Sequence, residues 1–347
     1  MKSVDFHNAF RIFMCYVGAV IGAGFASGQE IMSFFSGCGT YGMWGIIISG
    51  ILFFLYGWIA LSKIRNHNIE SFSGYFEGIA GKKIALLIQY IAYGFMFASF
   101  CVMISGSGAV AEELFGVNTV GILFMAILCF VVFLKGVDGM VAVNAVMTPL
   151  IIIGIVLISV LSLSGRSADV FKIFGKDSLT DNFVVSAIVY VSYNTVTLIG
   201  VFLPLKPFIT SRKVSFTAPL LSGCVLATMG CLIWFLINLF GDKLSGADVP
   251  MLTIAGETGN IIKYLYAAVL YMAMITTAVS SGFALIEFLK SKTHLGNASI
   301  SATLCTLSIP LAYVGFSNLV DKLYRFFGFV GAFVLFAVLL DGVRWRR

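Results

Sequence analysis

The sequence predicts an all-α integral membrane protein with ten transmembrane helices. Of its 347 residues, 59% are hydrophobic and only 11% are charged, and the mean hydropathy is +1.00. A soluble globular domain carries about 25% charged residues, so most of this surface must face lipid. A bilayer core about 30 Å thick needs about 20 apolar residues for each helix. Ten runs of this kind occur, at residues 8–36, 42–62, 84–110, 118–134, 141–163, 183–205, 214–240, 259–289, 298–315 and 319–341.

The basic residues predict the orientation of the chain. Numbering the loops alternately from a cytoplasmic N-terminus places 15 of the 22 Lys and Arg residues on one side of the membrane and 7 on the other. Because basic residues accumulate on cytoplasmic loops, both termini are expected in the cytoplasm. This topology accounts for the net charge of +6, so no nucleic-acid partner is expected.

The ten runs divide into two halves of five, residues 8–163 and 183–341, within a single transmembrane domain that covers residues 1–347. An odd number of spans makes the two halves enter the membrane in opposite senses. The sequence therefore predicts a five-plus-five inverted repeat, an architecture that many transporters share. The short connections leave no room for a soluble domain.

The first span contains a stretch that weakens a helix, "YVGAVIGAGFASGQE" at residues 16–30. It holds four glycines and ends on Glu30, which is costly in apolar surroundings. One interpretation is that the glycines only let helices pack closely, because their spacing fits the small-xxx-small pattern. The polar residues that follow favour a broken helix, whose irregular backbone must line a cavity.

The sixth span, which is the first of the second half, carries the polar residues Ser192, Tyr193 and Asn194 near its middle. Such side chains bond to the local backbone and lower helix propensity. We therefore expect this span to be broken as well. Interrupted helices at corresponding places in two halves are the best indication of a binding site in a transporter sequence.

The eighth span presents a stripe of hydroxyl groups. Thr277, Ser280 and Ser281 share one helical face in "TAVSS", with Ala273 and Ala284 above and below them. These hydroxyls can simply bond back to their own helix or to a neighbour. Opposite an unwound glycine segment, they would instead complete an oxygen shell for a small hard cation.

The motifs "GAVIGAGF" and "TAVSS" resemble the sodium site of the LeuT-fold transporters, which form the amino acid–polyamine–organocation superfamily. Within it, the opening "GAVIGAGFASGQE" is most similar to the YkvI-like bacterial membrane proteins. The resemblance implies a LeuT-like fold in the bacterial inner (cell) membrane, a small-molecule substrate, sodium as the coupling ion and no organic cofactor. It also implies a sodium site made of the carbonyls of Gly18, Ile21 and Thr277 and the hydroxyls of Ser280 and Ser281.

The resemblance further implies which residues contact the substrate. These are Gly22, Ala23, Gly24, Tyr93 (with Tyr90 as the alternative), Ser192, Tyr193 and Asn194. Glu30 departs from the pattern of the amino-acid carriers. It is interpreted as the partner of a substrate amine, a proton site or an outer-gate residue, and alternatively as an interfacial residue in an outer vestibule.

The function predicted from these features is sodium-coupled symport of an amino acid or a related small amine by alternating access. Some proton-coupled relatives place a lysine of the fifth span where sodium would sit. The span at residues 141–163 has no Lys or Arg, which favours sodium. The alternatives are a proton-coupled or nucleobase-type transporter and a transport-inactive membrane sensor of the same fold. The sequence has no GxSxG motif and no metal-ligand cluster in a span, so we expect that it is not an enzyme.

Overall fold

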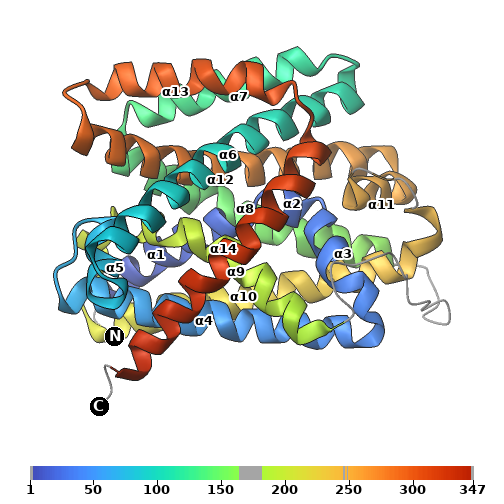
Figure 1. The fold of residues 1–347 in the computed structure, drawn as a ribbon. Coiled ribbons are helices and arrows are strands. Elements are labelled where there is room, and N and C mark those ends of the chain that lie inside the picture. The colour runs from blue at the N-terminus through green and yellow to red at the C-terminus, as the bar shows by residue number, and fades with distance from the viewer. Residues whose placement is uncertain (1–2, 164–181, 245–246, 248, 345–347) are drawn as a thin grey trace.

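The computed structural model describes residues 3–163, 182–244, 247 and 249–344. All the regular secondary structure assigned in this part of the chain is helical (Figure 1). The α-helices are α1 (Ser3–Val20), α2 (Ala23–Ala26), α3 (Gln29–Phe35), α4 (Gly42–Asn66), α5 (Phe72–Ala80), α6 (Lys82–Phe115), α7 (Asn118–Phe133), α8 (Gly136–Leu163), α9 (Phe183–Phe202), α10 (Arg212–Phe240), α11 (Pro250–Thr258), α12 (Asn260–Lys292), α13 (Asn297–Ala312) and α14 (Phe316–Arg344). The short 3-10 helices are η1 (Ser36–Tyr41), η3 (Lys206–Phe208) and η4 (Gly241–Lys243). The prediction of an all-α protein is confirmed.

Side-chain and glycine caps set several of the helix ends. The Asn182 side chain starts α9 by accepting hydrogen bonds from the amides of Val184 and Val185, at 2.9 and 3.3 Å. The Ser211 hydroxyl starts α10 in the same way, by accepting from the Val214 amide. Such caps satisfy amides that have no partner inside a helix. At the other end of a helix, Gly116 stops α6 in the left-handed conformation, with φ of 74°.

Each of the ten predicted apolar runs falls on helical structure, and the first falls on α1, α2 and α3 together. Within the described residues, six stretches are long and apolar enough to cross a membrane: Gln29–Asn66, Lys82–Phe115, Gly136–Leu163, Phe183–Phe202, Arg212–Phe240 and Asn260–Lys292. The chain is thus a multi-pass membrane protein. The α7 and α13 helices have 16 residues each, which is about 24 Å and shorter than the bilayer core. The full count of ten spans stays a prediction.

The predicted break in the first span is confirmed. Helix α1 ends at Val20, and Gly22 is extended, with φ of −92° and ψ of −169°, before α2 begins. A second interruption follows at Gly28, whose φ of 80° lies in the left-handed region that favours glycine. The first span is therefore a chain of three helices rather than one.

The prediction of a break in the sixth span is wrong, because α9 runs through residues 192–194 without interruption. Its polar side chains bond to the backbone of the same helix. The Asn194 amide donates to the Tyr190 carbonyl at 3.0 Å, and the Thr195 hydroxyl donates to the Ser192 carbonyl at 2.8 Å. These bonds are compatible with helical backbone, so the polar stretch does not unwind it.

Helix α1 lies at the centre of the bundle and packs against α8, α9, α10 and α12. Around it, α4 packs along α10, α9 packs along α14, and α12 packs against both α6 and α8. Helices α7 and α13 lie side by side at one edge (Figure 1). The connection predicted at residues 164–182 lies almost wholly outside the described residues.

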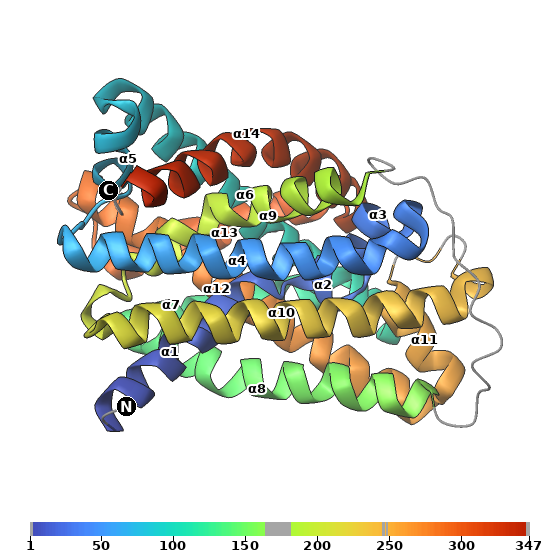
Figure 2. The same cartoon turned by 90° about the horizontal axis from the view of Figure 1, so that it is seen from below.

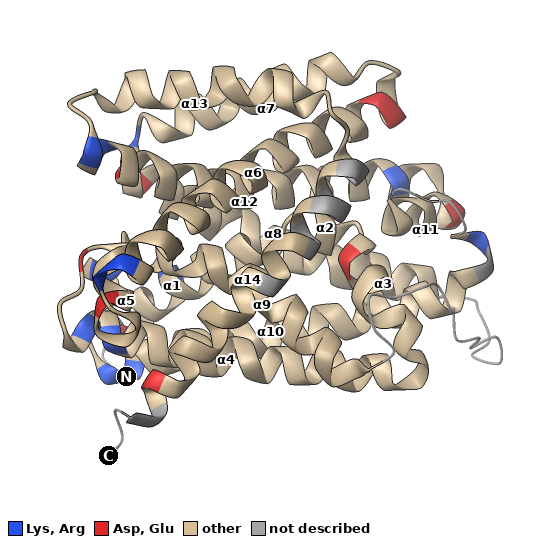
Figure 3. Ribbon diagram, in the orientation of Figure 1, with Lys and Arg blue, Asp and Glu red and all other residues tan. Residues whose placement is uncertain are grey.

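The bundle has two distinct ends. Helix α1 begins and α14 ends at one of them, beside α5, and we call this the terminal end (Figures 1 and 2). Helices α3 and α11 lie at the opposite end, which we call the far end. The charged residues gather mainly at the two ends, and the middle of the bundle is almost free of them (Figure 3). This distribution is what a bilayer around the middle of the bundle requires.

Candidate functional site

A small cavity lies at the break in the first span, and we call it the central cavity. Its lining comes from α1, α3, α6, α9 and α12 and from the break itself: Ala19, Val20, Gly22, Glu30, Phe95, Ser99, Tyr193, Asn194, Thr197 and Thr277. Its volume of about 20 Å³ is enough for about one water molecule. Ligand pockets usually measure about 300–1,000 Å³, so a solute can bind here only if the helices move apart.

The break is held against α12 by direct contacts. The Thr277 hydroxyl donates to the carbonyl of Gly18 at 3.0 Å and approaches the carbonyl of Ala19 at 3.5 Å. A β-carbon added at Gly22 would lie 3.2 Å from the same hydroxyl oxygen. The carbonyls at the end of α1 thus face the hydroxyl stripe of α12, as the sequence predicts.

Helix α8 adds a third wall that the sequence analysis missed. The Asn144 amide donates to the Ser280 hydroxyl at 3.2 Å and to the Met140 carbonyl at 2.9 Å. The Asn144 Oδ1 atom is buried and has no hydrogen-bond partner among the described residues. A β-carbon at Gly18 would lie 2.1 Å from this oxygen and 2.8 Å from the Thr148 hydroxyl. Polar residues four apart in an otherwise apolar run were the signal that could have found them.

The predicted sodium ligands on α1 and α12 thus lie together. Ile21 lies at the break, is fully buried and donates its amide to the Val17 carbonyl at 2.8 Å. Gly18, Thr277, Ser280 and Ser281 form what we call the oxygen cluster, together with Asn144. The Ser281 hydroxyl donates to the Thr277 carbonyl at 2.8 Å, a bond within one helix. The Gly18 carbonyl and the three hydroxyl oxygens each keep a lone pair in these bonds, and Asn144 Oδ1 keeps both. The Thr277 carbonyl accepts both the Ser281 hydroxyl and its own helical bond, so it has no lone pair left for an ion. The other neutral oxygens suit a small hard cation, and the donor set therefore fits sodium.

Three predicted substrate residues line the central cavity, namely Gly22, Tyr193 and Asn194. Two others lie next to it on α2. The Ala23 amide lies 3.4 Å from the Met103 sulfur, and Gly24 lies under Glu30, where a β-carbon would meet the carboxylate.

The structure does not bring the remaining two predicted substrate residues to the central cavity. Tyr93 stacks on Phe288 at 4.0 Å between ring centres and lines a different cavity nearer the terminal end. Ser192 has its carbonyl against Gly331 of α14, where a β-carbon would lie 2.1 Å away. On α6 the lining positions are instead Phe95 and Ser99, two and six residues after Tyr93.

Glu30 is the acidic residue of the central cavity. Its exposed fraction is 4%, which contradicts the interpretation as an interfacial residue in an outer vestibule. Its carboxyl group lies beside the Tyr193 side chain, and its Oε2 atom has no hydrogen-bond partner among the described residues. None of the residues that line the cavity is basic. A buried carboxylate is costly without a counter-charge, so this site is matched to a cation or a proton.

The far end of the central cavity is closed by aromatic rings. Phe34 of α3 stacks on Tyr193 at 5.7 Å, and Tyr190 meets both rings edge-on at 5.5 and 5.7 Å. Helix α11 covers the second interruption of the first span, where the Met251 amide donates to the Ser27 carbonyl at 2.9 Å. No solute can reach the cavity from the far end without breaking these contacts.

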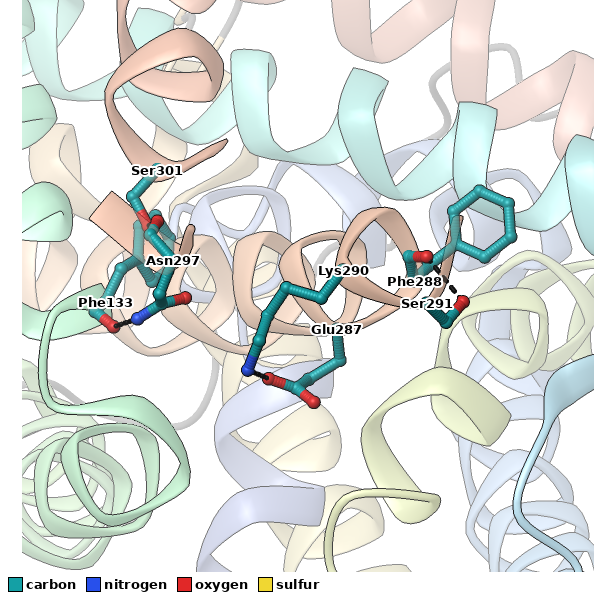
Figure 4. Close-up of polar contacts among 7 residues, drawn as sticks. All are labelled: Phe133, Glu287, Phe288, Lys290, Ser291, Asn297 and Ser301. Atoms are coloured by element: carbon teal, nitrogen blue, oxygen red, sulfur yellow. Dashed lines mark hydrogen bonds and ion pairs between the residues drawn. The ribbon is translucent and has the colours of Figure 1, made fainter. Parts of the chain in front are cut away.

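A larger cavity of about 470 Å³ lies nearer the terminal end, and we call it the inner cavity. Its lining includes Gln89, Tyr93, Gly200, Ala284, Glu287 and Phe288. Figure 4 shows its α12 side, where Glu287 pairs with Lys290, three residues later on the helix, at 2.9 Å.

Met96 lies between the two cavities. It is fully buried, and a β-carbon at Gly200 would lie 2.2 Å from its terminal methyl group. Gly200 lines the inner cavity, and Thr197, one turn earlier on α9, lines the central cavity. Met96 therefore packs on α9 at the boundary between residues that line the two cavities, whereas the far end is closed by several rings.

The fold is that of the LeuT-fold membrane transporters. It superposes on MhsT in complex with L-phenylalanine with a TM-score of 0.72 and 13% identity, covering 94% of this chain and 87% of that one. A substrate-bound, outward-open Na⁺-coupled sialic acid symporter gives 0.59 and 16%, with coverage of 94% and 84%. The manganese transporter of Eremococcus coleocola gives 0.63 and 14%, with coverage of 95% and 78%. These three proteins are transporters, and at this level of identity the likeness shows the shared fold.

Among curated proteins, the chain is similar to two uncharacterized proteins of Bacillus subtilis strain 168. It is 26% identical to the uncharacterized membrane protein YkvI over 353 residues, which cover 98% of both chains. It is 23% identical to the uncharacterized protein YyaD over 332 residues, covering 95% and 96%. The predicted resemblance to YkvI-like proteins is thus confirmed. No protein-family model matches the chain.

Proposed function

We propose that this protein is a secondary active transporter that carries a small organic amine, such as an amino acid, together with sodium by alternating access. The observation that carries the proposal is the joining of the broken first span to α12 and α8 through the oxygen cluster. This cluster adjoins a central cavity that contains one buried carboxylate, Glu30. An ion site and a charged solute site in direct contact can be coupled energetically.

Sodium is favoured over other cations by the donor set. The oxygen cluster offers neutral hydroxyl, carbonyl and amide oxygens, which are the ligands of a hard monovalent cation. No group of three or more His, Cys, Asp or Glu side chains that could hold a transition metal occurs in the described residues. The manganese named for one structural relative is therefore not carried over to this chain.

An amine is favoured as the substrate because Glu30 needs a positive partner. A substrate ammonium in the central cavity would supply the counter-charge that the lining residues do not. The L-phenylalanine bound to MhsT agrees with this class of solute. A proton on Glu30 would serve the same purpose, and proton coupling is therefore the second candidate. The aromatic rings of Phe34, Tyr190 and Tyr193 favour a nucleobase only weakly, because they pack on one another.

Alternating access would use the two barriers in turn. The structure has its far end sealed by aromatic rings and α11, and has the inner cavity on the other side of Met96. An outward-facing state requires separation of α3 from α9 and displacement of α11. Sodium can shift the equilibrium between the two states only by binding one of them more tightly. Because the oxygen cluster spans α1, α8 and α12, a relative movement of these helices would change its affinity.

The orientation and repeat belong to this proposal. The terminal end carries the basic loops and is assigned to the cytoplasm of a bacterial cell, so the inner cavity opens inward. Residues 8–163 and 183–341 are assigned to the two halves of an inverted repeat within one transmembrane domain.

The thermal stability of the purified protein tests the proposal directly. Unfolding midpoints are compared in sodium, potassium and choline chloride at equal ionic strength, and then with panels of amino acids, amines and nucleobases. A ligand present at 100 times its Kd adds about 2.7 kcal/mol to the free energy of unfolding. We expect a sodium-specific rise that one class of solute enhances. Equal midpoints in all three salts, with a dependence on pH alone, would replace sodium coupling by proton coupling.

A further inference from the structure

A second polar cavity, separate from the transport site, lies at the terminal end between α4, α10 and α14, and we call it the basic pocket. Its volume is about 400 Å³. It lies where α4 ends and α10 begins, at the level where the apolar runs give way to charged residues. The lining residues that matter here are Trp58, Lys63, Arg65, Arg212, Phe216 and Asp341.

The basic pocket holds more positive than negative charge. Lys63, which is 9% exposed, pairs with Asp341 at 2.7 Å and so uses the acidic group of the lining. Arg65 donates only to neutral groups, the side chains of Asn66 and Ser215. Within the described part of the chain, neither Arg65 nor Arg212 pairs with a carboxylate. Two guanidinium groups therefore remain for an anion.

Both guanidinium groups line the same pocket, so their like charges face a shared space. Like charges held together in a partly buried site destabilise the protein unless an anion lies between them. Arginine forms bidentate hydrogen bonds with phosphate. The Ser62 hydroxyl beside the two guanidinium groups donates to Ser215, and the Ser215 hydroxyl donates to the Arg212 carbonyl, so the guanidinium groups are the donors for a phosphate. The polar part of the pocket thus suits a phosphate group.

The opposite wall of the basic pocket is apolar. Trp58 of α4 and Phe216 of α10 meet edge to face at 5.4 Å between ring centres, and Phe216 is 38% exposed. A soluble phosphate gains nothing from such a wall, whereas the glycerol and acyl chains of a lipid can pack on it. Basic pockets between transmembrane helices on the cytoplasmic side suit anionic lipid headgroups.

We propose that the basic pocket binds the phosphate headgroup of an anionic phospholipid, with Arg65 and Arg212 as the phosphate ligands and Trp58 and Phe216 as the apolar wall. The lipid bridges α4 and α10 at their terminal ends. It therefore stabilises this pair of helices without touching the central cavity.

The test measures lipid-dependent stability of the full-length protein in nanodiscs. Discs of phosphatidylcholine alone are compared with discs that contain phosphatidylglycerol, and native mass spectrometry counts the lipids that stay bound. We expect phosphatidylglycerol to raise the unfolding midpoint of the wild type and to remain bound to it. Both effects should disappear in the Arg65→Gln/Arg212→Gln variant.

The matched control is Lys82→Gln/Lys83→Gln, which removes two exposed basic residues at the start of α6, outside the pocket lining. It should keep both effects, and an equal loss in the two variants would reduce the interaction to unspecific attraction and overturn the proposal. If the double variant does not fold, Arg212→Gln alone, in the first turn of α10, should still lower lipid retention. Inorganic phosphate added to phosphatidylcholine discs is the last arm. An equal rise in midpoint with phosphate would assign the pocket to a soluble anion instead.

Discussion

At the scale of single residues, Gly18 lets α1 approach α8 closely enough to form the oxygen cluster. Any side chain at this position would collide with Asn144 Oδ1, because a β-carbon would lie 2.1 Å from it. That amide is held in place by its bonds to Ser280 and Met140. The absence of a side chain at Gly18 therefore lets Asn144 Oδ1 approach the backbone of α1, which explains this glycine without helix breaking.

The Ser281→Ala variant tests the oxygen cluster. The loss of one ligand to a charged group costs about 1.5–3 kcal/mol, so we expect the apparent Kd for sodium to rise about 10- to 100-fold. The hydroxyl also bonds to the Thr277 carbonyl, and its loss should lower the free energy of unfolding by about 1 kcal/mol. The measurement is the sodium titration of the unfolding midpoint.

The control for this variant is Ser301→Ala in α13. The Ser301 hydroxyl is fully buried and bonds to the carbonyl of Asn297, four residues earlier, just as Ser281 bonds to Thr277. It should lose similar stability while keeping its sodium response. An unchanged sodium response in Ser281→Ala would remove this residue from the ion site.

The Glu30→Gln variant tests the charge of the central cavity. If Glu30 pairs with a substrate ammonium, the neutral amide should weaken solute binding about 10- to 100-fold and leave the stabilisation by sodium intact. Isothermal titration with the solute found in the stability panel measures the solute affinity. The sodium titration of the unfolding midpoint measures the stabilisation by sodium. Glu113→Gln is the control, because Glu113 pairs with Lys263 away from the cavity lining. Unaltered solute affinity together with a lost pH dependence would instead make Glu30 a proton site.

At the scale of helices, the first and sixth spans respond differently to polar or small residues. In the first span the glycines have no side chain of their own to bond back to the helix, and the chain breaks at Gly22 and again at Gly28. In α9 the polar side chains donate hydrogen bonds to carbonyls three or four residues earlier in the same helix, and the helix continues to Phe202. Movement of α9 during transport would therefore be that of a single rod, with Met96 of α6 as the part that yields.

The Met96→Ala variant tests this barrier. Truncation of a buried methionine costs about 2–5 kcal/mol of stability and should here join the central cavity to the inner cavity. A thiol introduced by Thr197→Cys, in a Cys224→Ser background, should then react faster with a membrane-impermeant reagent from the terminal end. The exposed thiol of Cys224 is removed so that it does not compete. Met125→Ala, another fully buried methionine on α7, is the control for general loosening and should not raise the rate. Equal rates in the two truncations would place the barrier elsewhere.

At the scale of the whole molecule, the arrangement concentrates charge at the ends of the bundle and leaves apolar side chains around its middle (Figure 3). This arrangement fixes the position of the membrane but not which end faces the cytoplasm. The excess of basic residues on one set of loops predicts that the terminal end is cytoplasmic.

Reporter fusions test this orientation. Alkaline phosphatase is active only outside the cytoplasm, so a fusion after Leu163 should be active and a fusion after Asn66 should be inactive. A green fluorescent protein at the C-terminus should fluoresce, because it folds in the cytoplasm. The opposite pattern at all three sites would invert the assignment and would make the inner cavity an outward-facing one.

The sequence by itself determined the helical class, the approximate positions of the long apolar helices, and the break in the first span together with its partner α12. Apolar run length and glycine content are local properties, and they act in the same way in any context. The hydroxyl stripe of TAVSS could also be predicted, because helical spacing alone places Thr277, Ser280 and Ser281 on one face.

Only the tertiary structure decided which side chains meet. Asn144 and Thr148 join the site because α8 packs against α1 at Gly18, and Tyr93 is excluded because its ring stacks on Phe288. The continuity of α9 was likewise decided by hydrogen bonds inside the folded helix, since the same polar residues are compatible with a break.

Glu30 is buried because α3 turns inward after Gly28 and places the carboxylate over Gly24. Long-range packing selects among conformations that local propensity leaves nearly equal in energy, and for that reason the sequence could not choose between them.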